Sequence, residues 1–159
     1  MKRKSVAVCA LVTTSVLVLS VVLFAADSNI GTWKLNLAKS KFSPGPPPQS
    51  QTLKIEAWGE HGVTYTSDGV GADGKPTHSE FQAKYDGKDN LFKGNADADT
   101  IAYRRINANT IEAVTKLKGK ATINARAVVS GDGKTRTLTQ TGKDAQGHDV
   151  NNVLVSEKQ

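Results

Sequence analysis

The chain contains a single cysteine, Cys9, and it lies in the N-terminal segment 1–26. Residues 27–159 therefore contain no disulfide and no cysteine-based metal site. A secreted domain of this size buries well over half of its unfolded surface, so a hydrophobic core can stabilise it without cross-links. Cys9 lacks the Leu-Ala/Ser-Gly/Ala run of a lipoprotein attachment box, and we interpret it as a small apolar residue of the N-terminal segment.

Concentrated positive charge is also lacking. The net charge is +6, but Lys2, Arg3 and Lys4 supply three of the positive charges, and the rest of the chain carries +3. Beyond this cluster the only adjacent basic pair is Arg104 and Arg105. Nucleic-acid binding requires a dense basic face. The sequence therefore predicts no nucleic-acid partner.

Catalytic signatures are missing as well. We find no Gly-x-Ser-x-Gly, no phosphate-cradling loop and no cysteine nucleophile beyond the segment 1–26. No segment carries a sustained helical period, and none is long enough for a βαβ crossover. The sequence thus predicts a protein that is not an enzyme, with no catalytic residues and no cofactor.

The segment 1–26 resembles a secretory leader. A basic cluster, Lys2–Lys4, precedes an uncharged run from Val6 to Phe24, which is followed by Ala25 and Ala26. This order is typical of a signal peptide, although the run is long enough to serve as an uncleaved anchor. Positive charge stays on the cytoplasmic side. We therefore expect residues 27–159 in the periplasm or outside the cell, with membrane contact only through an uncleaved leader.

After the leader, segments rich in Val, Ile, Thr, Tyr and Phe recur roughly every 8 to 12 residues, which is typical of an all-β sandwich or barrel. We predict one domain, an antiparallel up-and-down meander of eight to ten strands that closes into a barrel. The predicted strands are 31–35, 51–58, 62–67, 77–85, 90–94, 100–106, 110–117, 120–130, 134–141 and 148–157.

Short turns separate these strands. Asp-Gly occurs at 68–69, 73–74, 86–87 and 132–133, and Asn-Ala-Asn occupies 107–109. Such residues tolerate the positive φ of tight hairpins, and short connections join antiparallel neighbours. The segment 36–50 contains four prolines, which exclude strand and helix and favour an extended path. Two interpretations remain for it: a stiff crossover, or a strap over a barrel mouth.

Alternation of apolar and polar residues predicts which side chains face the core. Leu53, Ile55 and Ala57 share one face of strand 51–58. Ala121, Ile123, Ala125, Ala127 and Val129 share one face of strand 120–130, and Val153 and Val155 share a face with Asp149 and Asn151. Many inward residues are small. A barrel of eight to ten strands lined in this way is predicted either to enclose a cavity or to flatten around a filled core.

Two short motifs resemble lipocalins and fatty-acid-binding proteins, the calycin barrels. Gly31-Thr32-Trp33-Lys34-Leu35 resembles their opening Gly-x-Trp, and Val153–Lys158 resembles a closing last strand. The resemblance implies that Trp33 plugs the closed end of the barrel. The chain also resembles small exported bacterial proteins that share Trp-Lys-Leu-Asn, Ser-Pro-Gly-Pro and Asp-Gly-Lys-x-Arg-Thr. That likeness covers nearly all of residues 27–159.

The chain departs from fatty-acid-binding proteins at two places. Their two helices between the first strands are replaced by the proline-rich segment. Their carboxylate-binding Arg-x-Tyr falls on Leu154-Val155-Ser156. Because Leu154 cannot pair with a carboxylate, the fatty-acid head-group site does not carry over.

Five residues are candidates for contact with a ligand. Trp58 ends a strand on the face of Lys54 and Glu56, so we expect it at a rim. Tyr65, Phe81, Phe92 and Tyr103 are expected inside, where they line a pocket or fill it. Arg105 shares a face with Tyr103, and a buried guanidinium needs an anionic partner. Arg105 is therefore the expected contact for an acidic group; a register shift of one residue would put Arg104 there. The ligand-binding candidates are Trp58, Tyr65, Phe81, Tyr103 and Arg105.

Metal sites are not indicated. His78 and Glu80 share a strand face, but a zinc site needs three or four ligands. Asp97 and Asp99 lack the glycine and terminal glutamate of an EF-hand loop. The sequence thus predicts an exported, lipocalin-like barrel that binds a small apolar or amphipathic molecule. The alternative is an envelope protein with a filled core that contacts another protein; neither pattern indicates an oligomeric state.

Overall fold

The computed structural model describes residues 27–159, so the predicted leader and Cys9 lie outside the described residues. Ten strands are present, and each corresponds to a predicted one. Their bounds are β1 (Gly31–Leu35), β2 (Ser50–Trp58), β3 (Gly62–Val70), β4 (Pro76–Lys84), β5 (Asp86–Lys93), β6 (Thr100–Asn107), β7 (Thr110–Leu117), β8 (Lys120–Val129), β9 (Thr135–Lys143) and β10 (Asp149–Lys158). No helix within residues 27–159 is long and apolar enough to span a membrane.

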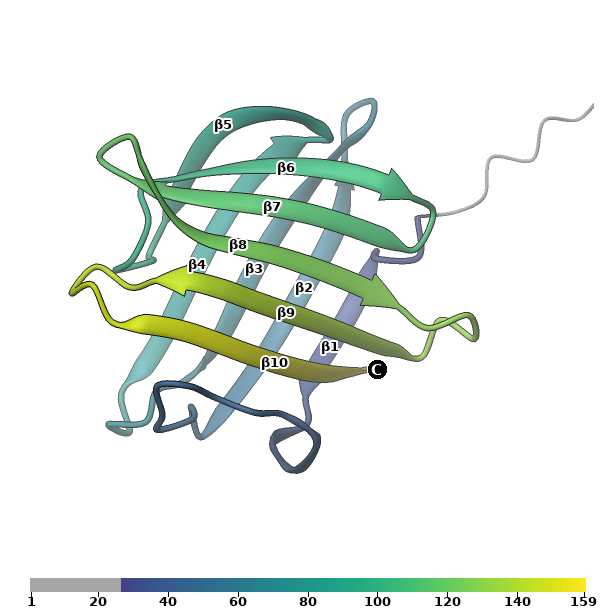
Figure 1. Ribbon diagram of the computed structural model, residues 1–159. Helices are drawn as coiled ribbons and strands as arrows, with labels where there is room; N and C mark the ends of the chain where they lie inside the picture. Colours follow the sequence, from purple (N-terminus) through teal and green to yellow (C-terminus); the bar gives the residue numbers. More distant parts are fainter. Residues whose placement is uncertain (1–26) are drawn as a thin grey trace, which may run out of the picture.

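The strands close into an antiparallel barrel, which confirms the predicted fold class. Each strand pairs with its neighbour in sequence, and β1 pairs with both β2 and β10. The closing contacts run from Trp33 opposite Lys158 to Leu35 opposite Ser156. Figure 1 shows this meander, with β10 next to β1.

Two of the four predicted Asp-Gly turns differ in the structure. Asp68-Gly69 lies inside β3, which continues to Val70, and Asp86-Gly87 forms the first two residues of β5, whereas the pairs at 73–74 and 132–133 lie in connections. A Cβ atom at Gly69 would lie 2.2 Å from the carbonyl oxygen of Ser50. Glycine is therefore required at this position by the close approach of β2 and not by a hairpin.

The proline-rich segment forms hydrogen bonds with β10 where β1 ends. It contains one short 3-10 turn, η1 (Leu37–Lys39), capped by Asn36, so the prediction of no helix is wrong for these three residues. Lys41 pairs with Val153 through two backbone hydrogen bonds of 2.7 and 2.9 Å. The segment thus lengthens the seam of the barrel and then crosses to β2.

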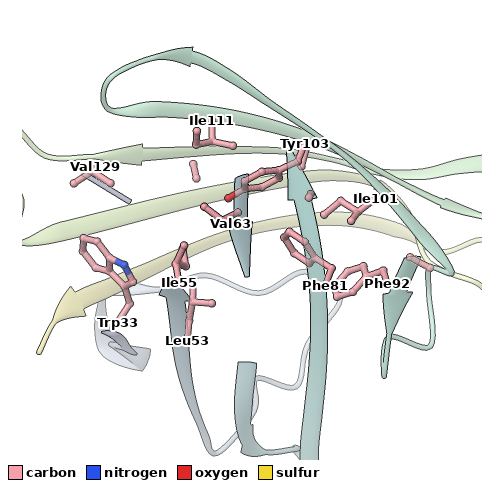
Figure 2. Close-up of a cluster of buried hydrophobic side chains, with 14 residues drawn as sticks. Trp33, Leu53, Ile55, Val63, Phe81, Phe92, Ile101, Tyr103, Ile111 and Val129 are labelled. Atoms are coloured by element: carbon pink, nitrogen blue, oxygen red, sulfur yellow. The ribbon is translucent and has the colours of Figure 1, made fainter. Parts of the chain in front are cut away.

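The core lies along the inside of the barrel, as Figure 2 shows. Trp33 is fully buried, and its Nε1 donates a hydrogen bond of 2.8 Å to the backbone oxygen of Asn29. The predicted inward faces of β2 and β8 hold except at Ala57 and Ala121, which are exposed where their strands reach the rim. The other buried apolar side chains of the core are Leu53, Ile55, Val63, Phe81, Ala83, Phe92, Ala98, Ile101, Tyr103, Ile111, Ala113, Ala127 and Val129.

The two ends of the barrel differ. At one end, which we call the Asp27 end, the segment 27–30 crosses from β6 to β1 beside the β2–β3, β4–β5, β6–β7 and β8–β9 turns. Ser28 Oγ donates to the backbone oxygen of Ala108, and Asn29 accepts from Trp33. The opposite end carries the segment 36–49, which we call the strap, and the remaining turns. We call it the strap end.

Candidate ligand site inside the barrel

Arg136 is the unexpected charge of the barrel interior. It is the second residue of β9, and its side chain lies on the same strand face as Leu138, which packs against the core. Arg136 is only 4% exposed, and none of the ion pairs among residues 27–159 includes it. Its Nε has no hydrogen-bond partner in this part of the chain. A buried guanidinium without a carboxylate is costly unless an anion compensates it.

Two tyrosines lie close to this guanidinium. Burial raises the pKa of Tyr65 and Tyr103, and the positive charge of Arg136 opposes both shifts. The Tyr103 hydroxyl is buried and forms no hydrogen bond of good geometry among the described residues, but the Arg136 side chain lies close enough to lower its pKa by hydrogen bonding as well as by charge. Both phenols therefore remain neutral at physiological pH, and the hydroxyl of Tyr103 can donate to an acceptor beside Arg136.

A row of aromatic rings leads away from this polar centre. Tyr65 stacks on Phe81 with ring centroids 4.5 Å apart, and Tyr103 meets Phe81 edge-on at 5.3 Å. Phe81 in turn contacts Phe92 at 5.3 Å, also edge-on. Figure 2 shows Tyr103, Phe81 and Phe92 following one another along the core. The polar centre is thus continuous with an apolar wall.

Arg105 points inward, as predicted, but it has an internal partner. Its guanidinium forms an ion pair with Asp27 and lies 4.0 Å from the centre of the Tyr85 ring. The same carboxylate accepts a hydrogen bond from the Tyr85 hydroxyl. Burial, and then the bond to Asp27, raise the pKa of Tyr85. Arg104 points outward and binds Glu112 at 2.9 Å, so the register shift considered above does not occur.

Buried polar atoms without partners occur at the Asp27 end of the barrel and in its core. Within residues 27–159 they belong to four side chains, Asn29, Tyr103, Arg105 and Arg136. Most are N–H or O–H donors, and only the Asn29 carbonyl oxygen is purely an acceptor. Buried polar groups normally have partners, so such a group of atoms indicates bound water or a ligand. The excess of donors and the unpaired Arg136 favour an anion.

The strap end has an opening. A cavity of about 270 Å³ is bordered there by Pro44 of the strap and by Gln140 and Asn152 of β9 and β10. Phe92, the last ring of the aromatic row, also lines it, together with Thr115 and Ile123. The backbone N–H of Ala145 donates to the Asp97 carboxylate at 2.9 Å, which connects two loops beside this mouth. Phe92 is the one ring of the aromatic row that lines this cavity; Tyr65, Phe81, Tyr103 and Arg136 do not line it.

The residues predicted from sequence separate into two groups. Phe81 and Tyr103 are buried in the core, and Tyr65 packs against it. Arg105 lies at the Asp27 end with its side chain 33% exposed, and Trp33 is buried near the same end. Trp58 is 39% exposed and lines a groove on the outer surface, so it does not join the interior set. Sequence reasoning missed Arg136 and Asp27. The available signal for Arg136 was its position two residues before Leu138, on the same face of a strand.

The histidines and acidic residues do not assemble a metal centre in the described part of the chain. No group of three potential ligands is present there. His78 Nδ1 lies 2.7 Å from Asp68 Oδ1, and its Nε2 lies 3.8 Å from Glu80. Asp97 accepts from the Ala145 N–H, and Asp99 accepts from the Lys118 N–H, so both carboxylates fix loops.

Fold and site together define a class: a closed, ten-stranded antiparallel barrel with an apolar core that also buries one arginine. The sequence matches no protein-family profile, and no curated protein shows significant similarity to it. Among solved structures, a redesigned β-barrel superposes with a TM-score of 0.52 at 11% identity, covering 85% of this chain and 95% of that one. The structure of EF1p2_mFAP2b bound to DFHBI gives a TM-score of 0.43 at 12% identity, covering 85% of this chain and 96% of that one. At these identities the likeness concerns the fold alone.

Proposed function

We propose that this protein is a non-enzymatic carrier that holds one small amphipathic molecule, with an anionic group, inside its barrel. The observation that carries the proposal is Arg136, a buried cation with no carboxylate partner among residues 27–159. Tyr103 adds a neutral donor, and the aromatic row offers an apolar path toward the strap end. A pocket with few polar groups and an apolar lining suits such a ligand.

Arg105 has a different role in this proposal. Because Asp27 already neutralises it, Arg105 fixes the segment 27–30 across the barrel end and does not bind the ligand. An anion at Arg105 would have to displace a carboxylate whose side chain is only 8% exposed. Arg136 needs no such displacement, and it therefore replaces Arg105 as the expected contact for the acidic group.

A pair of fluorescent probes that differ only in charge tests the proposal. One is 11-(dansylamino)undecanoic acid and the other is its methyl ester. We expect the native protein to bind the acid more tightly than the ester. Arg136→Gln should weaken binding of the acid by roughly 10- to 100-fold, the range of a lost charge-assisted hydrogen bond, and leave the ester nearly unchanged.

Arg126→Gln is the matched control. Arg126 lies on the neighbouring strand β8, but its guanidinium is outside the barrel and paired with Glu112 at 2.6 Å. The Arg126→Gln protein should bind both probes as tightly as the native protein does. Equal binding of the acid by Arg136→Gln and native protein would refute the head-group assignment. Failure of the native protein to bind either probe would favour the alternative, a filled barrel that contacts another protein.

Export through the leader is part of the same proposal, with the folded chain in the periplasm or outside the cell. The motif that supports it is the basic cluster followed by an apolar run and Ala25-Ala26. The chain mass of protein recovered from the cell envelope tests it. Cleavage after Ala25 or Ala26 is expected; the full mass in a membrane fraction would indicate an anchor instead, and the full mass in the cytoplasm would contradict export.

A further inference from the structure

A groove on the outer surface lies where β5 separates from β4. These strands share only the pairs Glu80–Lys93 and Phe81–Phe92, whereas β3 and β4 pair from Gly62–Lys84 through Val70–Pro76. The register of β5 against β6 also shifts between Asp86 and Asp89. Figure 1 shows the curved path of β5 at this place. The groove has a volume of about 440 Å³.

Trp58 forms one wall of this groove and is held in place by a glycine. A Cβ atom at Gly62 would lie 2.9 Å from Cε3 of the Trp58 ring, so the ring packs directly against the glycine backbone. Even so, Trp58 remains 39% exposed. One part of the indole is therefore seated on β3, and the rest is available to a molecule in the groove. Leu91, 62% exposed, also borders the groove.

Polar side chains line the remainder of the groove. Gln82 Nε2 donates to Thr64 Oγ1 at 3.1 Å, and Asn90 Nδ2 donates to the backbone oxygen of Lys88 at 2.7 Å. Each amide keeps its carbonyl oxygen and a second N–H for another partner. The two charged residues of the groove, Glu80 and Lys93, pair at 2.9 Å. The lining is thus rich in donors and acceptors but carries no net charge.

We propose that this groove binds a neutral pyranose unit of a glycan, with the sugar ring stacked on Trp58. A pyranose presents C–H groups on one face, which suit an aromatic ring, and hydroxyls at its edge, which both donate and accept. Thr64, Gln82 and Asn90 provide matching partners. An anionic ligand fits poorly because Lys93 is already paired, and a purely apolar ligand would leave the amides unsatisfied. Phe81, a ring of the aromatic row, also lines the groove, so the sugar site and the proposed carrier site share this residue, whereas Trp58 belongs to the groove.

The two tryptophans allow a direct test. They are the only tryptophans of the chain, one buried in the core and one in the groove. In protein labelled with 5-fluorotryptophan, ¹⁹F NMR should give two resonances, assigned with Trp58→Phe. Titration with tri-N-acetylchitotriose and with cellotriose should move the Trp58 resonance saturably at millimolar concentration for at least one sugar. The Trp33 resonance should stay fixed.

Variants with exposed side chains check that the groove itself is responsible. Gln82→Ala should weaken the sugar at least 5-fold, and Ile106→Ala, an exposed apolar residue of β6, should not change it. No movement of the Trp58 resonance with either sugar would overturn the proposal. A shift of that resonance by 11-(dansylamino)undecanoic acid and not by sugars would also overturn it, because the groove would then belong to the carrier site.

Discussion

Arg136 on β9 and Ser156 on β10 stand directly opposite each other, and both side chains are buried. The last strand, β10, carries no arginine, but the neighbouring strand supplies a guanidinium at the level of Ser156. The positive charge of the interior therefore depends on strand register, which no motif within β10 alone can predict.

The unpaired Arg136 predicts a conflict between stability and binding. Replacing even a buried ion pair by apolar side chains of similar volume is often neutral or stabilising by about 1–4 kcal/mol, and an unpaired buried charge has less attraction to lose. Arg136→Met should therefore raise the free energy of unfolding of the ligand-free protein, measured by urea denaturation, and weaken the acidic probe. Arg126→Met is the control at a paired, exposed position. A large loss of stability in Arg136→Met would show that Arg136 is compensated within the protein.

Alternation and turn residues were sufficient to predict the ten strands. Val, Ile and Thr at every second position determine which face is buried, and these signals are local. The last strand shows the limit of this approach. Leu154 and Ser156 face the interior across from Leu138 and Arg136, whereas Val153 binds the strap segment through its backbone. Val153 and Val155 share a face but did not indicate the core, because the core lies on the opposite face of β10.

The site was predicted only in part for a related reason. Tyr65, Phe81, Tyr103 and Arg105 were assigned inward from alternation within their own strands. Asp27 could not be assigned, since its contacts with Tyr85 and Arg105 exist only once the barrel has closed. The alternation of inward and outward side chains along β2 places Trp58 on the outer face of the barrel. The groove around Trp58 could not be predicted in this way, because it arises from the separation of β4 and β5.

The three tyrosines predict a loss of stability in alkali. Tyr65, Tyr85 and Tyr103 are all the tyrosines of the chain, and burial raises the pKa of each. Above pH 10 the unfolded chain loses these protons while the folded protein keeps them. The free energy of unfolding should therefore be insensitive to tyrosine below pH 9 and fall above pH 10, by up to about 1.4 kcal/mol per pH unit for each tyrosine.

Urea denaturation at pH 8, 9, 10 and 11 measures this effect. Lysines also titrate in this range, so the comparison of interest is native protein with Tyr85→Phe. Between pH 10 and 11 the free energy of unfolding of the variant should fall less than that of the native protein. The difference should approach about 1.4 kcal/mol, the contribution of one proton per pH unit. Identical slopes for the two proteins would mean that Tyr85 titrates as it does in the unfolded chain.

The strap depends on Ser40. Its hydroxyl donates to the backbone oxygen of Asn36 at 2.7 Å and accepts from the Val155 N–H at 2.9 Å. Ser40→Ala would leave that N–H without its partner, at a cost of about 1–3 kcal/mol. We expect lower stability in urea and faster hydrogen exchange at Val155. The exposed Ser50, at the start of β2, provides the control variant Ser50→Ala, which should change neither quantity.

Alanine variants at Gly87 and Gly94 distinguish two reasons why a glycine is needed, a positive φ and a close contact with a neighbouring strand. Both have φ of +73°, which disfavours alanine by about 1 kcal/mol. Around Gly87 a Cβ atom would meet nothing within 4 Å, but at Gly94 it would lie 2.1 Å from the carbonyl oxygen of His78. Gly87→Ala should therefore cost only about 1 kcal/mol. Gly94→Ala should cost several kcal/mol more, in the range of severe core substitutions.

Thermal unfolding of the two variants beside native protein makes this comparison, with circular dichroism as the signal. The excess loss in Gly94→Ala reports how tightly β4 and the end of β5 are held together at the strap side of the groove. Because these strands pair over such a short length, forcing them apart at Gly94 should also disturb Trp58 fluorescence, whereas Gly87→Ala should leave it unchanged. Equal stability of the two variants would contradict the close contact between Gly94 and His78, and with it the described path of β5.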